Sequence, residues 1–187
     1  SLNYYNIYRD SNTNIHSQKQ QKASHTIFSN KEFVKFFSKF TFKTETHNQI
    51  YETEDKFINN KFHSGTYYRI FPIIGLNIET PFKLKNSKSD FTYTPNIMFT
   101  ASPGMSNSNK ISNEDSSLNT YSIENNLSLN RYSGTDKLDN SKRINYGFTI
   151  NNQNINLNLS QNYEFTNNSN YHYEQGNENR LSDLLGS

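Results

Sequence analysis

Apolar side chains recur at every second position in three long stretches of the sequence, and this alternation limits the fold more than any other feature. Side chains on a β-strand point alternately to its two faces, so each stretch has one largely apolar and one polar face. The apolar faces carry Phe91, Tyr93, Pro95, Ile97, Phe99 and Ala101; Ile144, Tyr146, Phe148 and Ile150; and Ile155, Leu157, Leu159, Gln161, Tyr163 and Phe165. The pattern predicts an all-β, antiparallel protein.

Two earlier regions, around Phe40 and around Ile74, alternate in the same way with more noise. Their length matches the about 9–11 residues that cross a bilayer as a tilted strand, which favours a transmembrane β-barrel. A soluble antiparallel sandwich shows the same alternation, so both stay open on this evidence. About seven meander strands are expected, over residues 22–28, 33–46, 66–84, 90–101, 143–151, 154–166 and 181–187.

The composition is polar, with a mean hydropathy of −0.94 and only 32% hydrophobic residues. Disordered chains share this polarity but are poor in aromatic residues, whereas this chain has 14 Phe and 13 Tyr. A membrane barrel accounts for both facts, because only every second residue of its strands faces lipid. A net charge of +2 without a basic stripe argues against a nucleic-acid partner. No apolar run is long enough for a membrane helix.

The expected connections fall into two kinds. Outer-membrane barrels have short periplasmic turns and longer extracellular loops, so the two kinds must alternate along the chain. They alternate only if 102–142 is a single extracellular loop without a spanning strand; a short helix is expected within it, over about 122–129. The short connections are 29–31, 86–88 and 152–153, and the long ones are about 9–21, 47–65, 102–142 and 167–180.

Residues with catalytic or metal-binding chemistry form no recognisable group in the sequence. The five histidines lack metal-ligand spacing, and the chain has no Cys, no G-x-S-x-G motif and no phosphate-binding Gly-rich loop. Glu114 and Asp115 lack the regular oxygen spacing of a calcium site. We interpret them as part of a turn that bonds its own backbone. The sequence therefore predicts neither an enzyme nor a bound cofactor.

An ordered series of short motifs spans residues 113–147: NEDS, then NL, then RYSG with DK, and finally RINYG. In order and spacing the series resembles the signature of the LptD family, which runs roughly N-E-D-S, N-L-F, R-[FY]-S-G-x-D-R and R-x-N-Y-G. Ser128 stands where the family often has Phe, and Lys137 stands in place of Arg. The signature residues are Asn113, Glu114, Asp115, Ser116, Asn126, Leu127, Arg131, Gly134, Asp136, Arg143 and Gly147.

The resemblance implies an internal section of the C-terminal β-barrel of a Gram-negative outer-membrane protein that inserts lipopolysaccharide into the outer leaflet. It covers residues 66–187 best. It implies that the periplasmic jellyroll and the barrel-closing strands lie outside this sequence. The partners implied are lipopolysaccharide, outer-membrane lipids, an LptE-like lipoprotein plug and an LptA-like periplasmic bridge. The transport is non-enzymatic.

Polar side chains opposite the apolar faces would line the barrel lumen, where amides suit either a sugar or water. Within the long loop we expect Arg131 to pair with Asp115 or Asp136 and to tie the loop across the barrel mouth as a lid. The alternative is a solvated loop of mixed charge. The expected lumen-facing residues are Arg69, Asn77, Glu79, Asn96, Asn145, Asn156 and Asn158.

Two other functions stay open at this point. The chain could belong to another outer-membrane barrel, such as a porin or a receptor, with the motif match fortuitous. It could also be a soluble β-rich surface adhesin. Intolerance of charge at Ile97, Phe148 and Leu157 would favour either membrane protein over the adhesin.

Overall fold

The computed structural model describes residues 2–9, 18–86, 89–103, 109–117, 122–166 and 180–187. These residues form one nine-stranded antiparallel sheet and one short helix. The elements are β1 (Leu2–Arg9), β2 (Gln18–Lys35), β3 (Ser38–Ile58), β4 (Lys61–Glu79), β5 (Phe82–Asn86), β6 (Ser89–Ala101), α1 (Ile123–Asn126), β7 (Lys142–Asn151), β8 (Asn156–Glu164) and β9 (Leu185–Gly186).

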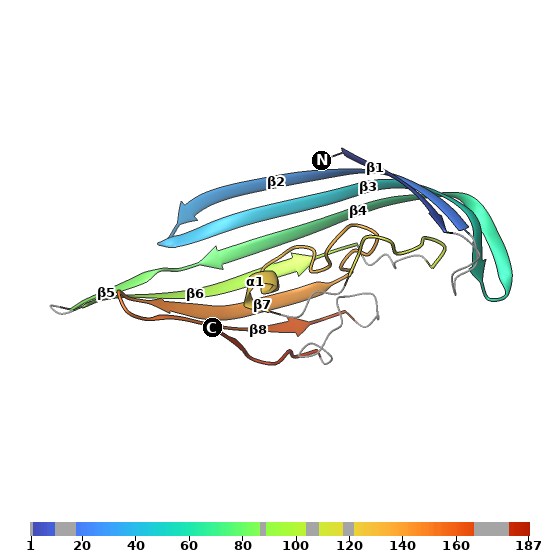
Figure 1. The fold of residues 1–187 in the computed structure, drawn as a ribbon. Helices are drawn as coiled ribbons and strands as arrows, with labels where there is room; N and C mark the ends of the chain where they lie inside the picture. The colour runs from blue at the N-terminus through green and yellow to red at the C-terminus, as the bar shows by residue number, and fades with distance from the viewer. Residues whose placement is uncertain (1, 10–17, 87–88, 104–108, 118–121, 167–179) are drawn as a thin grey trace.

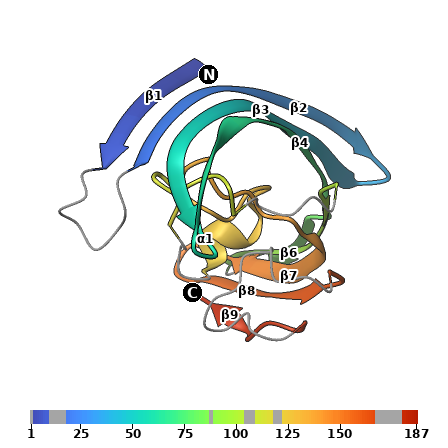
Figure 2. The same ribbon diagram turned by 90° about the vertical axis from the view of Figure 1, so that its right-hand side faces the viewer.

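The sheet is a curled meander in which each strand pairs with its neighbour in the chain, in the order β1-β2-β3-β4-β6-β7-β8-β9. The short strand β5 lies off this path and pairs with β6. Figure 1 shows β2, β3 and β4 on one side and β6, β7 and β8 on the other. In Figure 2 the sheet curves round α1 and the segment that follows it. Among the described residues β1 and β9, the two ends of the sheet, do not pair, so the sheet is open.

The three strands with the clearest alternation lie close to their expected ranges. β6 begins at Ser89 and β7 at Lys142, each one residue before its predicted start. β8 is shorter than predicted, ending at Glu164, and a short connection over 152–155 joins it to β7. A strong alternation of apolar and polar residues locates a strand well, because successive side chains of a strand point to opposite faces of the sheet.

Two predicted connections are wrong. Residues 29–31 lie inside β2, with Asn30 opposite Lys43, and the chain reverses at Phe36 and Phe37 instead. Residues 47–65 are strand on both sides of a two-residue turn at Asn59 and Asn60. Asn favours a turn only through its local backbone preference. The hydrogen-bonded ladder between β2 and β3 determines where the chain reverses.

The number of strands also differs from the seven expected. β1 was not predicted, and the range 66–84 divides into β4 and β5 at Pro81, which has no N–H for a ladder. Of the range 181–187, only Leu185–Gly186 is strand, with an isolated bridge from Leu181 to Tyr163. The turn expected at 86–88 and the loop expected at 167–180 fall largely outside the described residues.

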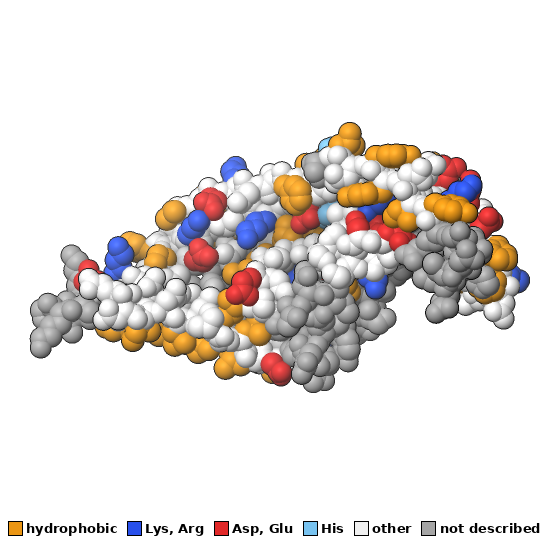
Figure 3. Space-filling view, in the orientation of Figure 1, with side chains coloured by type: hydrophobic (Ala, Val, Ile, Leu, Met, Phe, Trp, Pro, Cys, Tyr) orange, Lys and Arg blue, Asp and Glu red, His pale blue; other side chains and the backbone are white. Residues whose placement is uncertain are grey.

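In a water-soluble protein the enclosed face of a sheet is apolar and the outer face is polar. Here the polarity of the two faces is reversed. Every second side chain of β2 from Gln18 to Thr26 is polar and buried on the concave face. The convex face exposes apolar side chains, and Figure 3 shows them along the lower margin of the molecule, where β7 and β8 lie. Within the described residues, no helix is long and apolar enough to span a membrane. The exposed apolar side chains on the convex face include Phe42, Ile50, Tyr68, Ile70, Ile74, Phe99, Tyr146 and Leu157.

Gly147 lets β7 and β8 approach each other closely. A Cβ atom at this position would lie 2.2 Å from the carbonyl oxygen of Leu159 and 2.8 Å from Cα of Ser160. Ser160 is the residue paired with Gly147 across the ladder. The signature glycine is therefore required by backbone packing.

We expect Gly147→Ala to destabilise the protein by about 1–3 kcal/mol, because the added methyl group must displace backbone atoms of β8. Thermal unfolding of the full-length protein in detergent would measure this loss. Gly186→Ala is the matched control, since its Cβ would meet only the side-chain end of Leu159, at 3.1 Å. Equal losses in the two variants would show that the backbone clash at Gly147 is not the cause.

Candidate functional site: a loop latched inside the curved sheet

The long connection between β6 and β7 folds back against the concave face of the sheet. We call its described residues, 109–117 and 122–141, the inner loop. It joins two neighbouring antiparallel strands, and its only regular element is α1 in the described part. α1 covers 123–126 of the helix expected over 122–129. Figure 2 shows the inner loop enclosed by the curve of the strands.

The acidic turn at the start of the signature folds on itself, as the sequence suggested. The Asn113 side chain donates to the carbonyl of Ser116 (2.6 Å) and accepts from the N–H of Ser116 (3.0 Å). Asn113 thereby closes an Asx-type turn of the kind that short polar side chains favour. The turn leaves the carboxylate of Asp115 pointing toward the RYSG segment.

Asp115 and Asp136 bind each other's backbone. Asp115 Oδ1 accepts from the N–H groups of Thr135 (3.0 Å) and Asp136 (2.7 Å), while Asp136 Oδ2 accepts from those of Glu114 (2.7 Å) and Asp115 (3.1 Å). Gly134 has φ +72°, and a Cβ there would lie 2.2 Å from the carbonyl oxygen of Asp115. The signature glycine is therefore needed both for its positive φ and for close contact.

A buried lysine of the sheet joins both carboxylates. Lys22 of β2 is 3% exposed, and its Nζ lies 2.9 Å from Asp115 Oδ2 and 2.6 Å from Asp136 Oδ1. It also donates to Thr135 Oγ1 (2.6 Å). We call Lys22, Asp115 and Asp136 the latch. Lys22 and Asp136 are buried and Asp115 is partly buried, so removing one partner leaves uncompensated charge.

Strands β3 and β4 support the latch from the side. Tyr51 donates its hydroxyl to Asp136 Oδ1 (3.1 Å) and accepts from Arg69 Nη2 (3.0 Å). Arg69 and Gln49 both donate to the carbonyl of Thr135, at 2.7 and 2.8 Å. Three adjacent strands therefore hold one turn of the inner loop.

Charge and hydrogen bonds change the acidity of Asp115. Burial alone would raise the pKa of this carboxyl. The hydrogen bond from Lys22 and those from the backbone of Asp136 and Thr135 outweigh burial and hold the pKa of Asp115 well below its usual range. Asp115 is therefore ionised at neutral pH.

Arg131 pairs differently from the prediction. Its Nε lies 2.6 Å from Asp139 Oδ2, and its Nη2 lies 3.5 Å from Glu164 Oε2 on β8; it does not pair with Asp115 or Asp136. Arg143 of β7 shares Asp139 Oδ2 at 3.1 Å. The prediction was wrong because separation along the sequence does not show which acidic side chain lies nearest to Arg131 once the loop packs on β7 and β8.

These four side chains form a second charged group, which we call the root cluster: Arg131, Asp139, Arg143 and Glu164. All are between 0% and 2% exposed, so the inner loop is not a solvated loop of mixed charge. Ser141 also donates to Glu164 Oε2, at 2.5 Å. The root cluster fixes the end of the loop where it enters β7.

The NL motif connects α1 to strands β7 and β8. Asn126 is buried and donates to Ser160 Oγ of β8 (3.0 Å), and it accepts from Asn145 Nδ2 of β7. Leu127 packs against a small apolar cluster between the loop and the sheet. Gly75 leaves space for that cluster, since a Cβ there would lie 2.6 Å from Leu129 Cδ2. The cluster consists of Phe71, Ile73, Met98, Leu129 and Leu138.

The expected lumen-facing residues differ in their surroundings. Arg69, Asn77 and Asn145 are buried on the concave side. Glu79, Asn96 and Asn158 are partly buried, and Asn156, the first residue of β8, is exposed. Arg69 and Asn145 hydrogen-bond to the inner loop, through Thr135 and Asn126 respectively.

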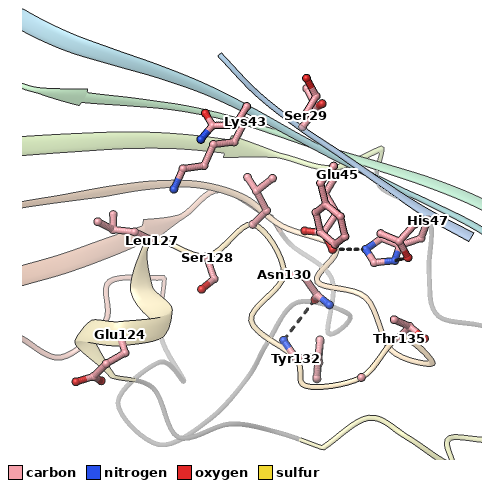
Figure 4. Close-up of a pocket in the computed structure, with 16 residues that line it drawn as sticks. Ser29, Lys43, Glu45, His47, Glu124, Leu127, Ser128, Asn130, Tyr132 and Thr135 are labelled. Atoms are coloured by element: carbon pink, nitrogen blue, oxygen red, sulfur yellow. Dashed lines mark hydrogen bonds and ion pairs between the residues drawn. The ribbon is translucent and has the colours of Figure 1, made fainter. Parts of the chain in front are cut away.

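A cavity of about 850 Å³ lies between the inner loop and the inner faces of β2 and β3. Figure 4 shows Lys43 extending from β3 toward Leu127 and Ser128. Two other lining residues pair with each other, with His47 Nε2 2.6 Å from Glu45 Oε1. The described residues contain no group of three or more His, Cys, Asp or Glu that could hold a metal ion. The cavity therefore offers hydrogen bonding and mixed charge.

Several residues of the site could not be found from the sequence. Lys22 lies in the run QKQQKASHT, which is polar on both faces and so has no alternation to show which side is buried. Phe71 and Ile73 break the alternation of β4, and this was the one available signal that something apolar covers the inner face. Glu164 looked like an ordinary polar position of a strand.

The comparison with protein families decides the identity. The family model described as "LptD: LPS transport system D" matches residues 1–187. The chain belongs to the LptD family. The resemblance seen in the signature thus extends over the whole sequence, including residues 1–65, and the porin, receptor and adhesin alternatives fall. Among curated proteins, none matches the sequence closely enough to count as a relative. LptD family proteins act in lipopolysaccharide transport and assembly at the outer membrane, and theirs is not an enzymatic role.

Replacing Lys22 by Met should release the latch of this LptD family member. The change leaves the buried carboxylate of Asp136 and the partly buried one of Asp115 without their cation, a loss of about 3–5 kcal/mol. Hydrogen exchange in residues 112–117 of the full-length protein should become faster. Lys19→Met is the matched control, because the Lys19–Glu54 pair on the same strand is exposed and contributes about 0–1 kcal/mol. Unchanged exchange in Lys22→Met would contradict the latch.

The latch should also respond to acid. Because the folded-state pKa of Asp115 is lowered, its contribution is complete above the ordinary carboxyl pKa of about 3.9 and is lost as the pH falls through the folded value. A spin label at Lys110 should show a constant mobility from about pH 8 to pH 5 and greater mobility only below about pH 4. Release near neutral pH would be inconsistent with a latch held by ionised Asp115.

Proposed function

We propose that this chain forms part of the wall of an outer-membrane β-barrel that inserts lipopolysaccharide into the outer leaflet, and that the inner loop is its gate. The observation that carries the proposal is the latch. A loop that bears the family signature is held by ion pairs to a buried lysine against the polar concave face of a sheet whose convex face is apolar. A polar interior and an apolar exterior suit a barrel in lipid.

The barrel itself is part of the proposal. The curl of the sheet supports it, and so does the need of strands in lipid to satisfy their backbone groups by closing. Further strands, outside this sequence, would pair with β1 and β9. An LptE-like lipoprotein and an LptA-like periplasmic bridge would be the partners, as the family membership suggests.

The gate would act through its two charged groups, which differ in what they connect. The root cluster joins the end of the inner loop to β7 and β8, the strands that directly follow it. The latch joins the same loop to β2, through pairs that lie 93 and 114 residues apart in the chain. Opening the latch while the root cluster holds would swing the loop from β2 and widen the cavity beside Lys43 and His47. The saccharide of lipopolysaccharide would pass there.

A reversible crosslink tests whether the loop must move. Gln20 and Ser112 exchange hydrogen bonds of 2.8 and 3.1 Å between β2 and the inner loop, so cysteines at these two positions, joined by a short crosslinker that reduction cleaves, should lock the gate. We expect the crosslinked double variant to export little lipopolysaccharide to the cell surface and to recover after reduction.

The two single-cysteine variants are the controls, and both should export normally after the same crosslinker treatment. Surface lipopolysaccharide can be followed by labelling in intact cells. Normal export with a fully formed crosslink would show that the loop is a static part of the wall. The gate would then be refuted, while membership of the family would stand.

A further inference from the structure

The turn between β2 and β3 has an unusual sequence for its geometry. Lys35 and Ser38 are paired, so the loop consists of Phe36 and Phe37 alone, with φ values of 51° and 63°. Positive φ at both central residues defines a type I′ turn, which favours Asn and Gly. Bulky side chains are rare there because Cβ crowds the backbone.

The same protein contains this turn with a favourable sequence. β3 and β4 reverse at Asn59 and Asn60, with φ values of 50° and 61°, between the paired residues Ile58 and Lys61. The two hairpin turns thus share one geometry and differ in residue type. Local folding preference explains Asn–Asn but does not explain Phe–Phe.

Packing within the described protein does not explain the two phenylalanines either. Phe36 is 80% exposed and Phe37 is 91% exposed. Behind them Phe33 and Phe40 stack with ring centroids 5.0 Å apart, and Val34 is 75% exposed. In Figure 2 the hairpin ends at a free tip on the right, away from α1. A strained turn whose two rings are exposed and not packed in a core points to a function outside the chain.

The charges around the tip indicate what it meets. Residues 29–43 contain Lys31, Lys35, Lys39 and Lys43 but only one acidic residue, Glu32, which pairs with Lys39 at 2.9 Å. Lys35 Nζ lies 5.0 Å from the centre of the Phe36 ring. Exposed aromatic rings flanked by lysines are typical of segments that enter a membrane interface and bind anionic headgroups.

We propose that the Phe36–Phe37 turn is a lipid anchor. The two rings enter the headgroup layer of a phospholipid leaflet, and Lys31 and Lys35 bind the phosphates beside them. The tip is convex and exposed on both faces of the hairpin, which suits a fluid lipid surface better than a shaped protein groove. The proposal rests on the membrane location in the proposed function and is independent of lipopolysaccharide handling.

Photocrosslinking in the full-length protein tests the anchor. Phe37 is replaced by the photoreactive analogue benzoylphenylalanine in cells whose phospholipids carry radioactive phosphate. As the matched control, Asn60 is replaced in the same way. It is the second residue of the β3–β4 turn, the position that Phe37 occupies in the β2–β3 turn. We expect a radioactive lipid adduct at position 37 and at least a several-fold weaker one at position 60. An adduct to a protein at position 37, or equal lipid labelling at both positions, would overturn the proposal.

A second variant separates anchoring from folding. Phe36→Asn with Phe37→Gly installs the preferred dipeptide of this turn, so the hairpin should be at least as stable as before. In vesicles with anionic phospholipid, a spin label at Ser38 should lie at headgroup depth in the parent protein and in water in the double variant. Equal depth in the two proteins would refute the anchor. Surface lipopolysaccharide, measured alongside, reports on the gate separately.

Discussion

The enclosed charge of Lys22 is the interaction on which the rest of the site depends. An ammonium group that is 3% exposed cannot be left without counter-charges, and both of its carboxylates come from the inner loop. Asp115 and Asp136 in turn order the backbone of the two signature turns, because each accepts N–H groups of the other's segment. One cation on the wall therefore organises two turns more than ninety residues further along the chain.

The concave face explains why the loop is so long and so polar. A sheet with a polar inner face and an apolar outer face has many buried donors and acceptors that need partners. The inner loop supplies several of them, as at Gln20 with Ser112 and Arg69 with Thr135. Where β4 and β6 place Phe71, Ile73 and Met98 inward, the loop covers them with Leu129 and Leu138. The inner loop therefore matches the concave face, with polar groups opposite polar groups and apolar side chains opposite apolar ones.

The sequence predicted the parts of the fold in which alternation was strong. β6 and β7 began within one residue of their expected positions, because a period of two matches the pleat of a strand and not the turn of a helix. It misplaced the β2–β3 turn at Asn30, because the turn preference of Asn is only local. It took residues 47–65 for a loop, because the inward-facing residues at the start of this range are polar and lie on a face that the inner loop covers. It also predicted the self-capping acidic turn, which needs only neighbours in the chain.

Within the site, the sequence alone determined the family and the importance of residues 113–147, since ordered motifs survive without coordinates. It also determined why Asn113 and Ser116 stand together in one turn. Only the tertiary structure decided that Arg131 binds Asp139 and Glu164 and that Lys22 is the partner of Asp115. The physical reason is that ion pairs depend on distance in space and on burial. For residues on different strands, both are set by the register and the curvature of the sheet.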